Sequence, residues 1–284
     1  MQPKRKKNSA SSGARPSRRP RPTSAKPSRS KERTASHKVV HPTPKVDEPM
    51  RLNKYVAHCG ICSRRQAVEH IKAGEVSVNG AVVIEPFYQV QPSDQVQFRG
   101  KNIRPEEHKV YILMNKPKDY ITTLSDEKGR KTVISLLKDQ VAERVFPVGR
   151  LDRLTTGLLL LTNDGDLAKN LSQPSHKVKK FYQVELNKPV DKADLERIRQ
   201  GLELEDGRAE VDGVDYIEGG RRSEVGIRLH IGKNRIVRRI FEHLGYEVKK
   251  LDRVYYAGLT KKDLPRGFWR HLTEQEVIML KHFT

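Results

Sequence analysis

The sequence predicts an α+β protein with two folded domains. A chain of 284 residues is long enough for two domains, since a globular domain typically has about 100–200 residues. Stretches of alternating apolar residues, which are typical of strands, follow one another without a helix between each pair. This order argues against a doubly wound parallel sheet. It favours a largely antiparallel mixed sheet flanked by helices.

The composition divides the chain into a basic tail at 1–48, a small domain at 49–106 and a larger domain at 107–284. Residues 1–50 contain 14 Lys or Arg and three Asp or Glu, with almost no large apolar residue before Val39. Such a segment buries too little surface to offset the entropy of ordering, so we expect the tail to be disordered. Two interpretations of it remain: an arm that makes weak, non-specific contacts with RNA, which we favour, and a solubilising extension.

The formal net charge of +21 is shared between the tail and the rest of the chain. The rest of the chain, after residue 50, contains 42 of the 56 basic residues and 32 of the 35 acidic ones, so this part is itself basic. Such a surface attracts phosphate backbones whatever their sequence. An anionic membrane is the competing partner, but no apolar run approaches the ~18 residues of a membrane span, and no signal-peptide core is present. We expect a soluble, cytoplasmic protein with no membrane partner.

The two cysteines, Cys59 and Cys62, form a single C-x-x-C pair. Structural zinc takes four ligands, and no second cysteine pair completes the set, although His58 and His70 lie nearby. A thioredoxin-like redox role is disfavoured as well, because no βαβ pattern surrounds the pair. We expect reduced, partly buried thiols near the end of a helix.

Local signals in residues 51–99 predict two helices followed by a hairpin. The first helix begins at Leu52, where apolar residues recur at helical spacing. The second follows the capping box Ser63–Gln66 and ends at Gly74. Asn79-Gly80 then joins two β-branched runs, which is a strong hairpin signal.

Arg64 and Arg65 occupy the first turn of the second predicted helix, where the helix dipole disfavours cations. An anion would complete this arrangement, and free helix amides with two guanidinium groups suit an RNA phosphate. The alternative is a pair of solvated surface arginines. We favour the phosphate site because the placement breaks a local rule.

The larger domain shows strand patterns separated by turns, with two helices near its end. The first strand is expected to break at Asn115-Lys116-Pro117. The expected strands are Val110–Met114, Leu158–Leu161, Phe181–Leu186 and Val225–Ile231, and the expected helices are Ile236–Leu244, which ends at Gly245, and one that follows the capping box Thr273–Glu276.

The loop Gly149–Gly157 is the most informative segment of the chain. It places Asp152 between Arg150 and Arg153, directly before an apolar strand. A carboxylate between two arginines can approach a polyanion without being repelled by it, as an enzyme acting on nucleic acid requires. The sequence lacks the phosphate-binding, dinucleotide-binding, nucleophile-elbow and zinc-helix motifs, so we expect neither a nucleotide cofactor nor a metal.

Several segments around this loop carry a family resemblance. They are Gly149–Asp152, Thr155–Gly157, Leu158–Gly165, Lys180–Val184, Gly232–Arg239 and Leu264–Arg270. In this order they resemble the pseudouridine synthases of the ribosomal small subunit synthase A type. Residues 51–99, with Arg-Leu-Asn-Lys-Tyr and Ser-Arg-Arg-Gln-Ala ahead of Val-Asn-Gly, resemble the S4 RNA-binding domain.

The resemblance implies isomerisation of a uridine to pseudouridine in ribosomal RNA. Large-subunit 23S RNA or an assembly intermediate is the expected partner, and small-subunit RNA stays open as the alternative. The target uridine must first be rotated out of the stack. By this resemblance, Asp152 is the essential aspartate, which attacks the base or sugar or stabilises the ribosyl cation. Tyr182 stacks on the base and accepts the C5 proton, Arg238 pairs with the carboxylate, and Arg150 fills the vacated space. The expected RNA contacts are Arg64, Arg65 and Lys54.

Each role has a simpler alternative. Asp152 could cap a turn, and Tyr182 could be a packed aromatic residue. Arg238 and Arg239 flank the apolar face of their helix almost symmetrically, so periodicity does not choose between them. The alternative function is a non-catalytic S4-containing RNA-binding or ribosome-assembly factor. We expect the enzyme, as a monomer.

Overall fold

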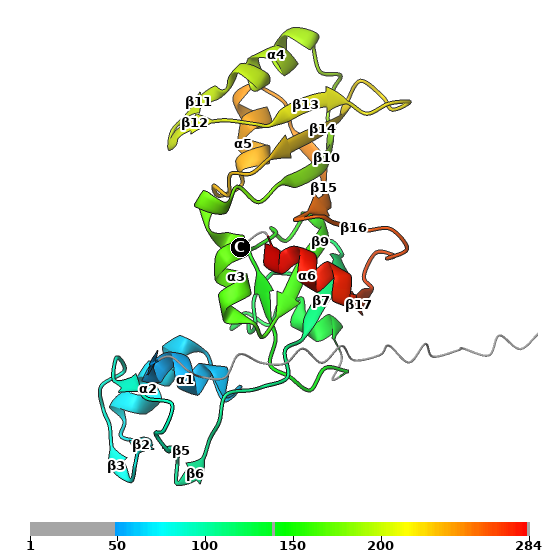
Figure 1. Cartoon of the computed structure of the whole chain (residues 1–284). Coiled ribbons are helices and arrows are strands. Elements are labelled where there is room, and N and C mark those ends of the chain that lie inside the picture. Colours follow the sequence, from blue (N-terminus) through cyan, green and yellow to red (C-terminus); the bar gives the residue numbers. More distant parts are fainter. Residues whose placement is uncertain (1–48, 138–139, 283–284) are drawn as a thin grey trace, which may run out of the picture. The chain divides into compact units, whose positions relative to one another are not determined.

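The computed structural model describes residues 49–137 and 140–282 (Figure 1). The tail predicted at 1–48 lies outside the described residues. None of the helices in the described ranges is long and apolar enough to cross a lipid bilayer.

The first described part of the chain contains two short helices and small antiparallel sheets, which confirms the predicted helix–helix–hairpin order. Ten buried residues from these elements, including Val56, Ile71 and Val96, form its core. The elements are β1 Met50–Arg51, α1 Leu52–His58, α2 Arg64–Lys72, β2 Val76–Val78, β3 Ala81–Val82, β4 Gln89–Val90, β5 Val96–Phe98 and β6 Lys101–Asn102.

The local turn and cap signals of this part act as predicted. Gln66 N donates to Ser63 Oγ at 3.2 Å, and Ser63 N donates to Gln66 Oε1 at 3.0 Å, so the capping box of α2 is complete. Gly74, just past the end of α2, has a φ of +74°. Asn79 and Gly80 both have positive φ, as the favoured two-residue hairpin turn requires.

The two cysteines are free thiols at the carboxyl end of α1 and just after it. Cys62 is buried and Cys59 is partly buried, as expected. Burial, with a smaller contribution from Cys62, raises the pKa of Cys59 to about 12, so its thiol stays protonated and unreactive near neutral pH. No group of three or more potential metal-ligating side chains occurs in the described ranges.

The remainder of the chain is built on one mixed sheet of nine strands. Its neighbouring strands are antiparallel except for β15 and β9, which are parallel, so the predicted largely antiparallel sheet is confirmed. In spatial order the strands are β13 Gly213–Tyr216, β14 Glu224–Leu229, β10 Lys180–Leu186, β15 Val248–Tyr256, β9 Thr156–Thr162, β7 Tyr111–Lys116 and β17 Trp269–His271, with β16 Leu259–Thr260 beside β15 and β8 Phe146–Val148 beside β9.

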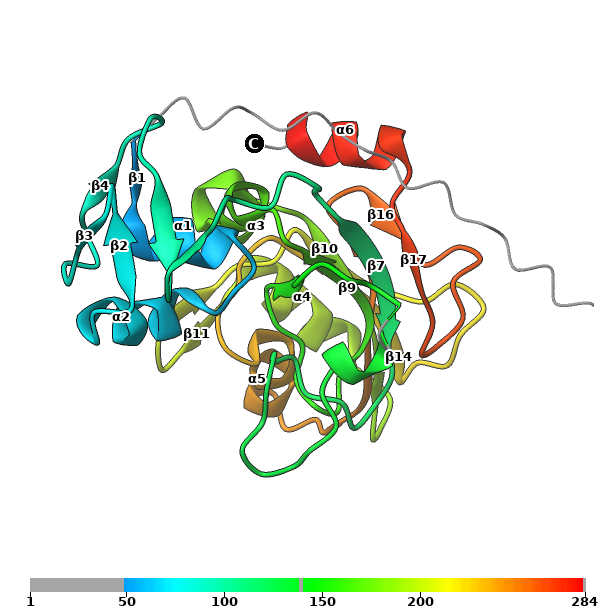
Figure 2. The same cartoon turned by 90° about the horizontal axis from the view of Figure 1, so that it is seen from below.

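Four α-helices and a small hairpin accompany this sheet in the described residues, as Figures 1 and 2 show. The helices α4 and α5 pack on β10 and β14, and α3 and α6 share a core with β7 and β9. Their bounds are α3 Gly165–Ser172, α4 Lys192–Gln200, α5 Ile236–His243 and α6 Glu274–His282, and the hairpin joins β11 Leu202–Leu204 to β12 Gly207–Ala209.

Alternate residues of β9 serve two different cores, because successive strand side chains point to opposite faces of a sheet. Leu158 and Leu160 pack with α3 and α6, whereas Leu159 and Leu161 pack with residues from the segment between β7 and β8. Tyr182 of β10 contacts this second core and also the core beneath α4 and α5. The core that contains Leu159 and Leu161 therefore meets the core beneath α4 and α5 at Tyr182.

The first strand ends within the predicted Asn115-Lys116-Pro117 break, but two residues later than the expected end at Met114. β7 continues through Asn115 and Lys116, and both side chains are buried. The strand tolerates them because their polar ends have partners: Asn115 Nδ2 donates to Leu264 O at 2.8 Å, and Lys116 Nζ donates to four backbone carbonyls. Buried polar groups that have hydrogen-bond partners avoid the free-energy cost of leaving water unpaired, so they can remain within a strand.

The two predicted terminal helices are confirmed. α5 begins at Ile236 and ends at His243, and Gly245 follows with a φ of +74°. Before α6, Thr273 N donates to Glu276 Oε2 at 2.9 Å and Glu276 N donates to Thr273 Oγ1 at 3.3 Å, which completes the expected capping box.

Candidate active site

The loop that carries Asp152 connects β8 to β9 and is anchored on both sides of that residue. Leu151 is buried in the core, and its carbonyl accepts a hydrogen bond from Thr122 Oγ1 at 2.7 Å. Thr155 is also buried, and its N–H donates to Asp152 O at 3.0 Å, which closes a turn. Asp152 itself is half-buried. The backbone is thus held in place while the carboxylate remains accessible.

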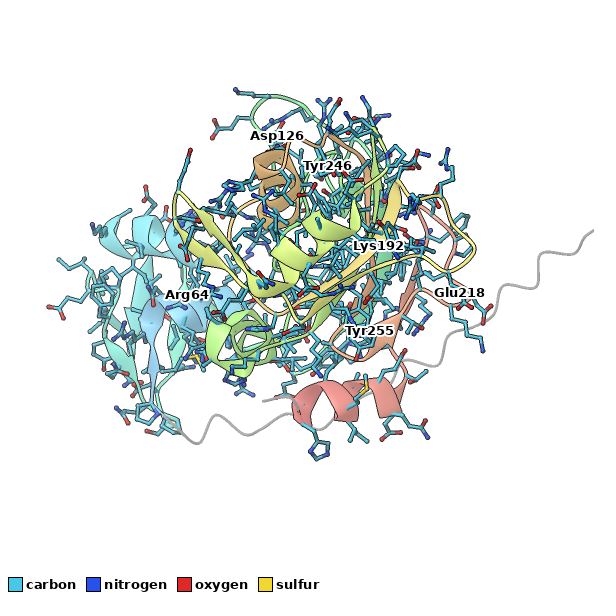
Figure 3. All side chains as sticks on the ribbon, turned by 90° about the horizontal axis from the view of Figure 1, so that it is seen from above. Arg64, Asp126, Lys192, Glu218, Tyr246 and Tyr255 are labelled. Atoms are coloured by element: carbon cyan, nitrogen blue, oxygen red, sulfur yellow. The ribbon has the colours of Figure 1, made fainter. Side chains whose placement is uncertain are left out.

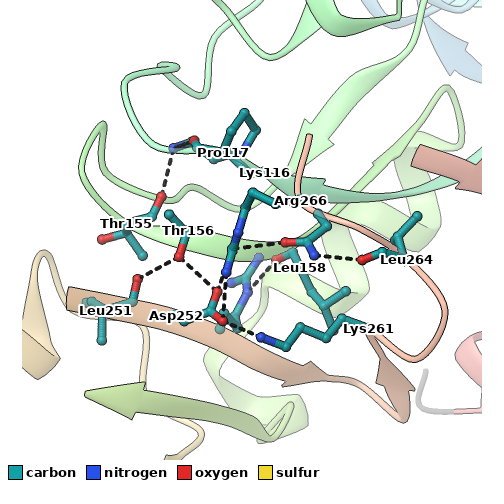
Figure 4. A network of polar contacts seen from close by, with 12 residues as sticks. Lys116, Pro117, Thr155, Thr156, Leu158, Leu251, Asp252, Lys261, Leu264 and Arg266 are labelled. Carbon is teal, nitrogen blue, oxygen red and sulfur yellow. Dashed lines mark hydrogen bonds and ion pairs between the residues drawn. The ribbon is translucent and has the colours of Figure 1, made fainter. Parts of the chain in front are cut away.

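Lys116 is the main internal support of this loop. Its side chain is fully buried, and Nζ donates to the carbonyls of Pro117 at 3.1 Å, Asp152 at 3.1 Å, Arg153 at 3.3 Å and Thr155 at 2.8 Å. Figure 4 shows this side chain beside Thr155. Burial lowers the pKa of Lys116 to about 8, and the charge of Asp152 opposes that shift. Lys116 therefore holds the loop and places a cation near the carboxylate.

Gly157 allows the end of the loop to approach β15. Its φ is +105°, and a Cβ there would lie 2.2 Å from Arg253 O and 2.5 Å from Arg253 N. No side chain fits in that space, because real Cβ atoms essentially never approach backbone atoms so closely. The parallel pairing of β9 with β15 therefore requires glycine at this position.

A second polar network fixes the start of β9 (Figure 4). Thr156 Oγ1 donates to Asp252 Oδ1 at 2.9 Å, and Arg266 donates to both oxygens of Asp252, at 2.7 and 3.0 Å. Lys261 Nζ also donates to this carboxylate. Burial acts to raise the pKa of Asp252, but the hydrogen bonds from Arg266, Lys261 and Thr156 outweigh it and hold the pKa at about 2. Asp252 is thus ionised and links β9, β15 and the segment before β17.

Tyr182 lies near the middle of the sheet, directly across from Arg253 of β15. Its ring contacts the core that contains Leu151, the chain neighbour of Asp152. Tyr182 and the chain neighbour of Asp152 therefore adjoin the same core, and the catalytic role of Tyr182 stays a prediction.

The structure distinguishes Arg238 from Arg239, which periodicity did not. Arg238 is buried on α5, and its Nη1 donates to Val248 O at 3.0 Å. Arg239 lies at the surface and forms an ion pair with Asp206, with Nη1 2.9 Å from Oδ2. Burial and then Arg235 lower the pKa of Arg238, and the charge of Asp152 opposes this shift. Of the two arginines, Arg238 is therefore the one whose charge interacts with the carboxylate of Asp152.

The expected direct ion pair between Asp152 and Arg238 does not form within the described residues. The two charges interact without contact, because the guanidinium group is held by the Val248 carbonyl. The carboxylate of Asp152 makes no hydrogen bond or ion pair in the described ranges, although its backbone carbonyl does. An accessible carboxylate in the field of two buried cations is suited to an incoming ligand rather than to a structural cap.

The predicted RNA-contacting residues lie at the surface. Arg150 is exposed beside Asp152 and makes no ion pair in the described ranges. Arg64 and Arg65 are exposed in the first turn of α2, which contains no acidic residue (Arg64 is labelled in Figure 3). Lys54 lies on α1 and is partly exposed. Their role as RNA contacts stays a prediction.

Three residues that organise the site were not predicted from the sequence: Lys116, Asp252 and Arg266. A lysine close behind an apolar run was the available signal for Lys116. Arg266 lay within a family motif, but nothing in the sequence connected it to Asp252.

Comparison with known proteins places these features in a family. Residues 110–243 match the RNA pseudouridylate synthase family, and residues 50–96 match the S4 domain. The chain is 41% identical over 234 residues to ribosomal large subunit pseudouridine synthase B of Bacillus subtilis, covering 81% of this chain and 95% of that protein. It is 36% identical over 238 residues to the dual-specificity RNA pseudouridine synthase RluF of Escherichia coli, covering 82% and 79%.

A solved structure agrees with this result. A crystal structure of a pseudouridylate synthase matches with a TM-score of 0.59 and 27% identity over 81% of this chain and 99% of that chain. The protein therefore belongs to the RNA pseudouridine synthases, with an S4 domain ahead of the synthase domain.

Proposed function

We propose that this enzyme converts a uridine of ribosomal RNA, in 23S RNA of the large subunit, to pseudouridine. The observation that carries the proposal is the accessible carboxylate of Asp152 on a firmly held loop near two buried cations. The names of the relatives from B. subtilis and E. coli support a pseudouridine synthase, and the former supports large-subunit RNA. The motif order supports membership in the small subunit synthase A subgroup.

The reaction is an isomerisation in which atoms and charges balance. The bond from C1′ of the ribose to N1 of the uracil breaks, the base turns, and a bond from C1′ to C5 forms. C5 loses one proton and N1 gains one, so the reaction consumes no co-substrate. Between the breaking of the first bond and the formation of the second, Asp152 either is bonded to the base or sugar as the nucleophile or stabilises the ribosyl cation with its negative charge.

The neighbouring residues divide the remaining tasks. Arg150 fills the space that the rotated uridine leaves, and Tyr182 stacks on the base and accepts the C5 proton. Arg238 stabilises the carboxylate from a distance in the free enzyme, and a direct pair forms once RNA excludes water from the site. A charge interaction gains strength when water is excluded, because the local dielectric constant falls.

We propose that the S4 domain, over 49–106, holds the RNA while the domain at 107–284 carries out the reaction. Arg64 and Arg65 present two guanidinium groups beside the amides at the start of α2, which suits a phosphate. Lys54 on α1 adds a third cation, which RNA would have to draw away from its ion pair with Asp166 at 2.9 Å. We further propose that the enzyme acts as a cytoplasmic monomer without a cofactor. A non-catalytic assembly factor would not need the combination of Asp152, Tyr182 and Arg238.

The test is carbodiimide-based mapping of pseudouridine in both ribosomal RNAs from cells with and without the gene. We expect one signal in 23S RNA to disappear on deletion and to return when the wild-type gene is restored. Identical maps from the two strains would contradict the proposed function. Loss of a signal in 16S RNA instead would retain the activity and correct the substrate.

A further inference from the structure

Leu154 is a large apolar side chain that the Asp152 loop exposes. Its side chain is 46% exposed, whereas Leu151 and Thr155 in the same loop are buried. Single exposed apolar residues are common on protein surfaces and need no explanation by themselves. The position of this one, two residues after the candidate nucleophile, distinguishes it.

The exposure of Leu154 is fixed by the backbone around it. On one side, the carbonyl of Arg153 accepts hydrogen bonds from Asp119 N at 2.8 Å and from Lys116 Nζ at 3.3 Å. On the other side, the N–H of Thr155 donates to the carbonyl of Asp152 at 3.0 Å. The two peptide groups that flank Leu154 cannot turn without breaking these bonds. The loop therefore presents the side chain to solvent in a defined place.

Two exposed cations, Arg150 and Arg153, lie in the same loop as this apolar side chain. Arg150 and Arg153 are both exposed, and Arg150 has no ionic partner in the described ranges. Arg153 has one acidic neighbour, Asp119, at 3.4 Å, and each of these two side chains is 57% exposed. Such a surface pair contributes little and can be exchanged for a phosphate. An apolar tip among arginines matches a nucleic-acid strand, which offers phosphates to the cations and base faces to the apolar group.

We propose that Leu154 is a wedge that contacts the nucleobases next to the target uridine and keeps the strand open while that uridine faces Asp152. This inference rests on the proposed function. Two residues of extended chain span at most about 7 Å, and stacked bases are spaced by roughly 3.4 Å. Leu154 is therefore close enough to Asp152 to contact the nucleotides adjacent to a uridine that faces this carboxylate. It is a positioning residue, and its contact is separate from that of Arg150.

The test compares Leu154→Ala with Leu154→Met and with Ile278→Ala. Ile278 lies on α6 and is 47% exposed, so its truncation removes a similarly exposed apolar side chain elsewhere. The RNA is a stem-loop that contains the uridine identified by the mapping experiment. A second version carries an abasic nucleotide next to that uridine, which leaves the uridine already unstacked.

On the native stem-loop, we expect Leu154→Ala to lower kcat/KM by about tenfold. Unstacking a base requires a few kcal/mol, and a tenfold change in kcat/KM corresponds to the loss of only part of that free energy. On the unstacked stem-loop, its kcat/KM should be within about twofold of wild type, because the wedge has no stacking to disrupt. Leu154→Met, which conserves apolar volume, and Ile278→Ala should resemble wild type on both RNAs.

A fluorescence measurement separates this inference from the chemistry. In an Asp152→Asn background, 2-aminopurine placed beside the target uridine reports unstacking without turnover, and its fluorescence should increase less when Leu154 is alanine. An equal increase with and without Leu154, or an equal loss of kcat/KM on both stem-loops, would overturn the wedge. Failure of the proposed function has a different signature, namely that wild-type enzyme forms no pseudouridine in either RNA.

Discussion

Replacing Lys116 with methionine tests how the Asp152 loop is held. The substitution keeps an unbranched side chain in β7 but removes the ammonium group that contacts four carbonyls. Because the side chain is fully buried, no water can replace those hydrogen bonds without opening the sheet. We expect the free energy of unfolding to fall.

The magnitude follows from three opposing contributions. An ammonium group has three protons, so these contacts amount to three full hydrogen bonds of roughly 1.5–3 kcal/mol each, or about 4.5–9 kcal/mol in total. Burial of the ammonium group, which lowers its pKa from 10.5 to about 8, opposes them by about 3 kcal/mol. The apolar methionine side chain regains about 1.5–3 kcal/mol. The midpoint of these ranges is a net loss of about 1.5 kcal/mol, which exceeds the change of less than about 0.5 kcal/mol expected for a substitution at the surface.

The assay is urea unfolding followed by circular dichroism, with Lys118→Met as the matched control. Lys118 is exposed two residues further along the chain, so its replacement should change stability by less than about 0.5 kcal/mol. If Lys116→Met and Lys118→Met unfold at the same urea concentration, the proposed support of the loop is refuted.

The pH dependence of the same pair has a definite sign. The folded-state pKa of Lys116, about 8, lies below the ordinary value of 10.5. Between these two pH values the unfolded chain binds more protons than the folded protein, so this group makes the wild-type protein more stable as pH rises. The stability difference between wild type and Lys116→Met should therefore widen from pH 8 to pH 10.5. A difference that narrows over this range contradicts the assignment.

Three further predictions address the rest of the site. Gly157→Ala should abolish folding or sharply lower the melting temperature, since its Cβ would lie 2.2 Å from Arg253 O; a wild-type melting temperature would refute the close approach. Combined Arg64→Ala and Arg65→Ala should weaken RNA binding and reduce the slope of log affinity against log salt by about one to two, and an unchanged slope would remove the phosphate site. Because Asp252 has its pKa lowered to about 2 from 3.8, wild type should lose stability as pH falls through that window, and acid unfolding of Asp252→Asn should lack this component.

The elements that depend on local signals were predictable from the sequence. The capping box at Ser63, the Asn79-Gly80 turn and the end of α5 at Gly245 each depend on residues a few positions apart. The S4 domain and the largely antiparallel sheet followed from such signals and from the resemblance. Local patterns succeed here because the backbone conformation at each of these positions is set by its immediate neighbours.

The supports of the active-site loop depend on contacts between distant parts of the chain. Lys116 and Asp152 are 36 residues apart, and Thr156 and Asp252 are 96 apart. The extension of β7 from Met114 to Lys116 was not predicted, because the carbonyl partners of Lys116 come from a loop that lies beside β7 only after the sheet forms. The distinction between Arg238 and Arg239 likewise depended on Asp206, which forms an ion pair with Arg239 at the surface. Helical periodicity contains no information about such partners.

The central claim is that the Asp152 carboxylate carries out the chemistry. Its most direct test is a single-turnover assay of Asp152→Asn on the mapped stem-loop, with RNA affinity measured in parallel. Asparagine has nearly the same shape but no negative charge, and phosphate contacts come from other residues. We predict no detectable pseudouridine with RNA affinity close to that of wild type. Product formation at the wild-type rate would contradict the account.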